Sequence, residues 1–181
     1  MKEMIIAKLP EINWIKDEDL RDKTVEVWQR AITKGGWTVE ELSDIPFTLT
    51  IDDARFSIIA HTRGVVHVSK NIADALISIF GNDVYKINYD VLIAGAILHD
   101  VGKLIEFEKV DGKYTKSRIG KLLRHPFSGQ ALCYAVGIPD EVAHCVAMHA
   151  KEGEGQRATT EAIIVNKADF ACFEPLKLDS L

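Results

Sequence analysis

An uninterrupted apolar run, residues 91–98, ends directly at His99 and Asp100. The run is apolar nearly all round a helix, so we expect it at the centre of a helical bundle. It is too short to cross a bilayer. An imidazole and a carboxylate at its end are costly to bury unless something pairs with them. A metal ion is the simplest partner, because it binds neutral imidazole and carboxylate together.

The composition is that of one soluble domain, alone or with a small appendage. The chain has 181 residues, and hydrophobic side chains make up 47% of it, which is enough for a sizeable core. The formal net charge of −5 argues against a nucleic-acid binder that relies on bulk electrostatics. The three cysteines form no CxxC pair, which favours a reducing cytoplasm over a disulfide framework. The mixed first ten residues predict no signal peptide.

Apolar residues at helical spacing predict an all-α chain with one small β-hairpin. The predicted helices cover residues 17–34, 37–43, 50–80, 89–100, 117–123, 125–136, 139–149 and 159–170. Thr50 with Asp52 and Asp53 predicts the start of the third helix, because a hydroxyl cap and acids suit a first turn. Alternation on both sides of an Asp-Gly turn predicts the hairpin, near residues 105–115.

Several of these helices present a histidine or an aspartate at the edge of an apolar face. These residues are His61, His99 with Asp100, His125, His149 and Asp169. A single helical histidine usually has an ordinary hydrogen-bond partner, and a lone aspartate is usually solvated. The repetition on separate helices is harder to explain in that way. Asp169 is the most telling, because it lies within an apolar pattern where a carboxylate needs a cation.

Two further histidines are weaker candidates. His67 lies about 240° around the helix from His61, so both cannot face one metal ion. His144 and His149 also lie on different faces of their helix. We therefore expect ordinary partners for His67 and His144.

The ordered set of candidate ligands resembles the HD-domain superfamily of metal-dependent phosphohydrolases. The likeness rests on the segments HTRGVV, AGAILHDVGK, RHPFSG, AMHAKEGEG and NKADF. It covers residues 50–173 and includes the two histidines that the single-metal branch of the superfamily lacks. We take residues 49–181 as the HD domain and residues 1–48 as an N-terminal helical extension.

The resemblance implies a helical bundle that holds one or two divalent transition-metal ions. Carried over by position, one ion would be bound by His61, His99, Asp100 and Asp169, and a second by His125 and His149. Asp100 would bridge the two ions. Lys103, which follows the His-Asp pair, would support the ligands from outside or reach the substrate phosphate.

Such a site predicts hydrolysis of a phosphoester. Imidazole and carboxylate ligands suit Fe, Mn, Ni, Co or Zn, and the sequence does not choose among them. Two ions that share Asp100 would lower the pKa of a water held between them, and this water would attack phosphorus. We predict a metal-dependent phosphohydrolase, either a phosphomonoesterase or a phosphodiesterase, that cleaves a nucleotide or other small phosphoester. Asp100 and Lys103 are its predicted catalytic residues. The predicted contacts to the phosphate are Lys103, Arg124, Lys121 and Arg118.

Other functions remain as alternatives. The segments HDVGKLIEFE and YTKSRIGKLLRHPFSG are similar to the HD portion of bacterial 3′-to-5′ exoribonucleases. An exoribonuclease or a cyclic-nucleotide phosphodiesterase is therefore one alternative, and a metal-binding sensor or regulatory module without turnover is another. The net charge favours small substrates over long RNA. We expect a cytoplasmic protein without membrane contact, and a homo-oligomer stays open.

Overall fold

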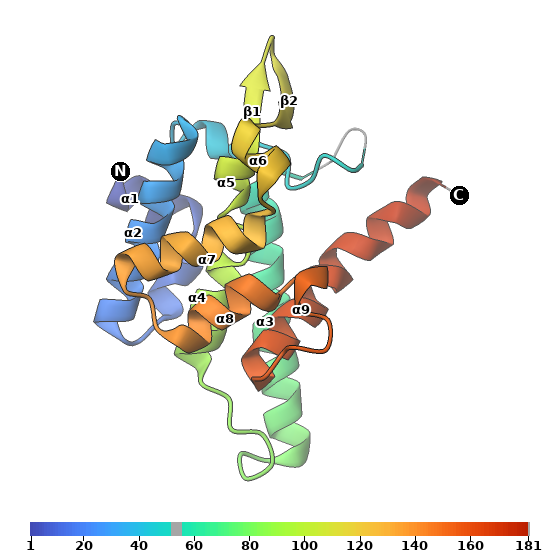
Figure 1. Ribbon diagram of the computed structural model, residues 1–181. Coiled ribbons are helices and arrows are strands. Elements are labelled where there is room, and N and C mark those ends of the chain that lie inside the picture. Colours follow the sequence, from blue (N-terminus) through green and yellow to red (C-terminus); the bar gives the residue numbers. More distant parts are fainter. Residues whose placement is uncertain (52–55, 181) are drawn as a thin grey trace.

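Helices make up nearly all the regular structure of the chain, as Figure 1 shows for the computed structural model, which describes residues 1–51 and 56–180. The elements are α1 (Lys2–Lys8), η1 (Pro10–Trp14), α2 (Glu18–Gly35), η2 (Glu41–Ser43), α3 (Ile58–Phe80), α4 (Tyr89–Leu98), α5 (Lys103–Glu106), β1 (Phe107–Val110), β2 (Lys113–Lys116), α6 (Arg118–Leu122), α7 (His125–Val136), α8 (Asp140–Met148), η3 (Lys151–Gly153), α9 (Thr160–Phe173) and η4 (Glu174–Ser180). The predicted all-α class is confirmed. The acids of one predicted helix start, Asp52 and Asp53, lie outside the described residues. No helix within the described ranges is both long and apolar enough to cross a membrane.

Helix α4 is the centre of the bundle, as its composition predicts. Every residue from Val91 to Leu98 is buried, and α2, α3, α8 and α9 pack around the helix. Full burial of each larger aliphatic side chain contributes about 1.5–3 kcal/mol to folding. The side chain of Asn88 caps the first turn by accepting hydrogen bonds from the backbone amides of Asp90 and Val91. The next turn of chain therefore begins deep inside the protein.

The N-terminal helices contribute to the same core as the rest of the chain. Apolar residues of α1, η1 and α2 belong to one buried cluster with those of α4, α8 and α9. Glu11 of η1 is buried, and its Oε1 accepts hydrogen bonds from Arg63 Nε at 2.8 Å and His67 Nε2 at 2.9 Å. Both partners lie on α3. The division of the chain at residue 48 stays a prediction.

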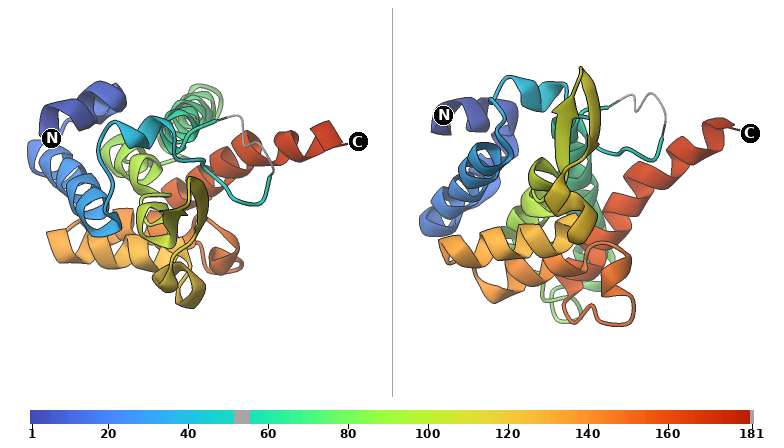
Figure 2. Two further views of the ribbon diagram at one scale, coloured as in Figure 1. Left: turned by 90° about the horizontal axis from the view of Figure 1, so that it is seen from above. Right: turned by 45° about the horizontal axis from the view of Figure 1, so that its top comes forward.

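Helix α3 begins at Ile58, later than the sequence predicts. The Ser57 side chain caps it by accepting a hydrogen bond from the Ala60 amide. Before this point the backbone pairs with the segment that follows η2, because the Phe47 amide donates to the Phe56 carbonyl. Residues 56 and 57 therefore pair with another segment instead of continuing the predicted helix. The last predicted helix ends at residue 170, whereas α9 runs to Phe173 and η4 continues from it, away from the bundle (Figure 2).

The predicted hairpin is present and stands beside α5 at one end of the bundle (Figure 1). β1 and β2 pair antiparallel, with Phe107 opposite Lys116. Asp111 and Gly112 both have positive φ, at 50° and 77°. Two successive left-handed residues are what a tight two-residue hairpin requires. The first strand begins later than predicted, because Ile105 belongs to the short helix α5.

Close packing of the turn after α4 leads to a stability prediction. A Cβ on Gly102 would collide with the backbone carbonyl of His125 and the amide of Gly129. We expect Gly102→Ala to lower the free energy of unfolding by about 1–3 kcal/mol, as overpacking does. Gly64→Ala is the matched control, because its Cβ would meet only Cys172 Sγ, at an ordinary 3.7 Å. That variant should be neutral or more stable by about 0.5–1 kcal/mol through helix propensity. Urea unfolding measures both, and equal effects would contradict the prediction.

The buried Glu11 carboxylate predicts an acid-sensitive contact between η1 and α3. Burial alone would raise the pKa of Glu11, but hydrogen bonds from Arg63 and His67 outweigh it and hold the pKa below its ordinary 4.5. A carboxyl with a lowered pKa stabilises the fold above its unfolded-state pKa, and this contribution disappears as the pH falls through the folded-state pKa. At neutral pH we expect Glu11→Gln to lower the free energy of unfolding by about 1–3 kcal/mol. The difference from the parent chain should shrink on acidification below pH 4.5. A difference that does not depend on pH would contradict this.

Candidate metal centre

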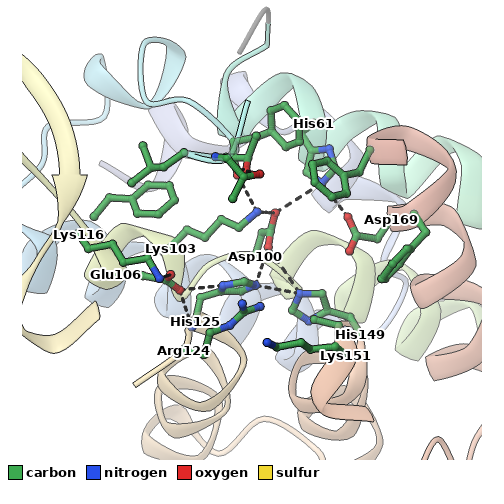
Figure 3. A pocket seen from close by; sticks show the side chains of 18 residues that line it. His61, Asp100, Lys103, Glu106, Lys116, Arg124, His125, His149, Lys151 and Asp169 are labelled. Atoms are coloured by element: carbon green, nitrogen blue, oxygen red, sulfur yellow. Dashed lines mark hydrogen bonds and ion pairs between the residues drawn. The ribbon is translucent and has the colours of Figure 1, made fainter. Parts of the chain in front are cut away.

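The six side chains that the sequence predicts as ligands converge at the end of α4. His61 comes from α3, His99 and Asp100 directly follow α4, His125 begins α7, His149 directly follows α8, and Asp169 comes from α9. Five of these six are buried, and Asp169 is half-buried. Figure 3 shows the side chains of Asp100, His125 and His149 pointing toward one another, with those of His61 and Asp169 beside them.

The converging atoms form two groups that meet at Asp100. The groups are His61, His99 and Asp169, and Asp100, His125 and His149, and within each the candidate ligand atoms lie within 4.8 Å of one another. One carboxylate oxygen of Asp100 faces each group. Oδ2 lies 3.4 Å from His61 Nε2 and 3.3 Å from His99 Nε2. Oδ1 lies 3.3 Å from His125 Nε2 and 3.6 Å from His149 Nε2. A carboxylate placed in this way can bridge two ions.

Helix ends orient two of the imidazoles. His99 Nδ1 lies 2.7 Å from the carbonyl oxygen of Ala96, and His149 Nδ1 lies 2.7 Å from that of Val146. A carbonyl oxygen only accepts hydrogen bonds, so Nδ1 carries the hydrogen in both rings. In a neutral ring Nε2 is then left with a free lone pair, which is the form that binds metal. Both rings direct this nitrogen toward Asp100.

Glu106, which the sequence did not predict as part of the site, orients a third imidazole. Its Oε2 accepts hydrogen bonds from His125 Nδ1 at 2.8 Å and from the His125 amide at 2.7 Å. Burial would raise the pKa of Glu106, but the contacts with His125 outweigh it and lower the pKa to about 2. In an extended strand, Glu106 would point to the face opposite Ile105 and Phe107. Its position in α5, one turn after Lys103, turns it inward instead.

The site holds its carboxyl groups ionised. Burial opposes ionisation of Asp100, but the charges of Lys103 and His99 outweigh it and keep its pKa well below the usual range. Asp169 is half-buried, and its contact with His61 Nε2 at 3.0 Å lowers its pKa to about 2. Burial alone would lower the pKa of His99, yet the neighbouring carboxylates raise it above the ordinary value. The centre therefore favours positive charge.

The arrangement of the ring nitrogens fits a bound cation. His125 Nε2 and His149 Nε2 are 3.2 Å apart, and His61 Nε2 and His99 Nε2 are 3.4 Å apart. Burial lowers the pKa of His125 to about 4, so its ring is neutral at physiological pH. His125 and His149 both carry the hydrogen on Nδ1, so in the neutral rings the two Nε2 lone pairs face each other, which is unfavourable unless a cation lies between them. Imidazole nitrogens with carboxylate oxygens suit Fe, Mn, Co, Ni or Zn.

Lys103 lies on the Asp100 carboxylate. Its Nζ donates hydrogen bonds to Asp100 Oδ2 and to the Phe47 carbonyl, both at 2.6 Å. The sequence left two positions open for this side chain, beside the ligands or on the substrate. The structure places it beside Asp100 and on the wall of a cavity of about 340 Å³ that borders the centre.

The cavity brings together cations and aromatic rings. Its lining includes Lys116, Arg124, Lys151, Phe107, Phe170 and Phe173. Of the predicted phosphate contacts, Arg124 lines it with Lys103, whereas Arg118 and Lys121 are exposed on α6 and are not among its described lining residues. Neither Lys116 nor Lys151 was predicted as an individual contact to the phosphate. Their positions depend on the hairpin register and on the chain reversal after α8.

The two weaker histidine candidates lie apart from both ligand groups. His67 is bound to Glu11 and contacts the ring of Trp14 edge-on, with 4.9 Å between the ring centres. His144 Nε2 accepts a hydrogen bond from the Ala158 amide at 3.0 Å. The ordinary partners predicted for both are present.

Comparison with known proteins agrees with this geometry. An archaeal protein of Methanocaldococcus jannaschii named dihydroneopterin 2′,3′-cyclic phosphate phosphodiesterase is 32% identical over 166 residues. The match covers 87% of this chain and 64% of the relative, so the chain spans slightly less than two thirds of the relative's length. No solved structure is a significant match. The sequence profile of the HD domain matches residues 58–170, which is more than half of the chain. The chain therefore belongs to the HD domain family.

Proposed function

We propose that this chain is a metal-dependent phosphohydrolase whose substrate is a small cyclic phosphate diester joined to a nucleotide-like heterocycle. The observation that carries the proposal is the Asp100 carboxylate, which offers one oxygen to each of two buried ligand groups beside a cavity. Membership of the HD domain family supports hydrolysis of a phosphoester. The name of the archaeal relative supports the cyclic diester and the heterocycle.

We assign the two ligand groups to two divalent ions. One group is His61, His99, Asp169 and Asp100 Oδ2, and the other is His125, His149 and Asp100 Oδ1. Ions held there would polarise a phosphoryl oxygen and lower the pKa of a water to near neutrality. The protein contributes ionised carboxylates and imidazole rings whose Nε2 atoms are already aimed at Asp100. This preorganisation costs no rearrangement during the reaction.

Lys103 and the cavity cations act on the phosphate. The ammonium of Lys103 holds Asp100 ionised and oriented, and it places a positive charge beside the reacting centre. Arg124, Lys116 and Lys151 line the same cavity and attract an anion to it. Charge that builds on the phosphate oxygens during in-line attack is stabilised by these cations.

Aromatic rings on α9 provide a surface for the heterocycle. Phe170 and Phe173 lie one turn apart, line the cavity and are only half-buried. Stacking of a base on such a ring contributes about 1–3 kcal/mol. The cavity volume of about 340 Å³ is at the small end of ligand sites and suits a single ring system with one phosphate. Together with the net charge of −5, it favours a small substrate over an RNA chain.

The bridging position of Asp100 leads to a prediction about metal content. We expect the purified chain to hold up to two transition-metal ions, and Asp100→Ala to lose at least one of them. Hydrolysis should fall by more than about 100-fold, because losing only an outer partner of a ligand already costs about 10–100-fold. Elemental analysis and a phosphate-release assay measure the two effects. Asp83→Asn, which removes an exposed acid from the loop before α4, is the control and should change neither. Full metal content and full turnover in Asp100→Ala would contradict the ligand assignment.

The aromatic lining leads to a prediction about the substrate. The test measures hydrolysis of a panel of candidate substrates, each with Mn²⁺, Fe²⁺ or Zn²⁺. The panel contains dihydroneopterin and nucleoside 2′,3′-cyclic phosphates, linear nucleotides, dinucleoside polyphosphates and short RNA. We expect turnover of the heterocyclic cyclic phosphates. Phe173→Ala should raise their KM by about 5- to 150-fold, which corresponds to 1–3 kcal/mol of lost stacking.

Glycerol 1,2-cyclic phosphate is the control substrate for this prediction, because it has the cyclic diester and no heterocycle. Its KM should not change in Phe173→Ala. An equal rise for both substrates would remove Phe173 from ring binding. No turnover of any compound by the metal-loaded protein would favour a sensor over an enzyme.

A further inference from the structure

Glu106 is a buried carboxylate at the edge of the metal centre that belongs to neither ligand group. Its exposed fraction is 5%, and it lies at the end of α5, close to the beginning of α7 (Figure 3). A buried carboxylate is costly unless its oxygens are fully bonded. Both oxygens have partners here. Oε2 is bound to His125 through two hydrogen bonds, and Oε1 lies 3.2 Å from Lys116 Nζ.

The bond to His125 differs from those that orient the other rings. His99 and His149 give their Nδ1 hydrogens to neutral backbone carbonyls of their own helices. His125 gives its hydrogen to an ionised side chain from a different helix. A carboxylate acceptor fixes the tautomer and also makes the opposite nitrogen a stronger ligand. That nitrogen, Nε2, lies 3.3 Å from Asp100 Oδ1.

The backbone around Glu106 holds this carboxylate in place. The Glu106 carbonyl accepts a hydrogen bond from the Ser117 amide at 2.9 Å. Gly120 of α6 packs directly on it, since a Cβ at residue 120 would collide with the Glu106 carbonyl. Lys116 approaches from the last position of β2. The hairpin and α6 therefore fix the side chain that orients His125.

We propose that Glu106 is a positioning residue of the centre, which fixes His125 as the Nδ1–H tautomer and strengthens Nε2 as a ligand beside Asp100 and His149. Lys116 holds the second oxygen of the carboxylate, so that Oε2 stays on His125. The effect on an ion bound by His125 rests on the proposed two-ion site. The effect on the tautomer does not, because it follows from the contacts of the protein alone.

A purely structural role would have different consequences. The Glu106 carboxylate also accepts a hydrogen bond from the backbone amide of His125, in the first turn of α7. The N-cap residue of α7, Arg124, makes no capping hydrogen bond with its side chain, so Glu106 also caps this helix. Removal of a helix cap costs about 0.5–2 kcal/mol of stability. Such a loss would change neither the tautomer of a ring nor the affinity for one ion out of two. These two quantities therefore separate positioning from capping.

The test uses the full chain with three substitutions. Glu106→Leu removes the acceptor, Glu106→Gln keeps an oxygen for His125 but removes the charge, and Glu108→Gln removes a charge two residues further along the chain. Among the described residues Glu108 makes no contact with His125. Long-range ¹H–¹⁵N correlation spectra of metal-free protein report the His125 tautomer. Calorimetric titration with Mn²⁺ reports the affinity of each ion separately. Mn²⁺ is chosen because it binds more weakly than the later divalent transition metals, so that the affinities stay within the measurable range.

We expect the parent chain to show His125 as the Nδ1–H tautomer and to bind two Mn²⁺ ions. Glu106→Leu should lose that tautomer and bind the weaker ion about 10- to 100-fold less tightly, with the affinity for the other ion unchanged. Glu106→Gln should keep the tautomer and show an intermediate affinity, and Glu108→Gln should match the parent chain.

Three results would overturn the positioning role. These are a different His125 tautomer in the parent chain, an unchanged tautomer in folded Glu106→Leu, and parental affinity for both ions in Glu106→Gln. The last result decides the question even if Glu106→Leu does not fold. Binding of fewer than two Mn²⁺ ions by the parent chain would instead contradict the two-ion site of the proposed function, and the tautomer measurement would still decide the role of Glu106.

Discussion

The Asp100 carboxylate is ionised and buried, so neighbouring groups have to balance its negative charge. It is 1% exposed and follows the most apolar helix of the chain. An unpaired charge at that depth would cost several kcal/mol. Lys103 supplies one positive charge at 2.6 Å, and four imidazole nitrogens surround the two oxygens. A cation held between the nitrogens and the carboxylate would complete the compensation, and a site of this kind would suit chemistry on an anion.

The C-terminal ends of two helices orient two of the candidate ligands of this centre. The last carbonyl groups of an α-helix have no partner within the helix. At Ala96 and Val146 these groups accept the Nδ1 hydrogens of His99 and His149, which follow their helices directly. One contact thus satisfies a buried carbonyl and selects the tautomer that leaves Nε2 free. His125 begins its helix instead of ending one, and it takes its acceptor from Glu106 of α5.

The short segment from α5 through α6 connects the metal centre to the cavity. Lys103 contacts the Asp100 carboxylate, and Glu106 contacts the His125 ring. Lys116 is paired with Glu106, and both line the cavity. An anion in the cavity therefore lies close to a chain of charged contacts that ends at His125. In the proposed hydrolase, substrate binding and ligand orientation share this segment. Phe170 and Phe173 form a different part of the wall, on the helix that carries Asp169.

Much of this protein was determined by the sequence itself. The buried α4, its Asn88 cap, the Asp-Gly hairpin and the convergence of the predicted ligands follow from local patterns, because burying an imidazole or a carboxylate has a cost that a sequence displays. Other features needed the tertiary structure. The start of α3 depends on pairing between the backbones of Phe47 and Phe56. Glu106 faces inward only because α5 is a helical turn, and Arg118 and Lys121 face solvent because of how α6 packs on that turn. Which charged side chains reach the cavity is decided by contacts between segments distant in sequence, since a surface cation costs nearly the same free energy wherever it points.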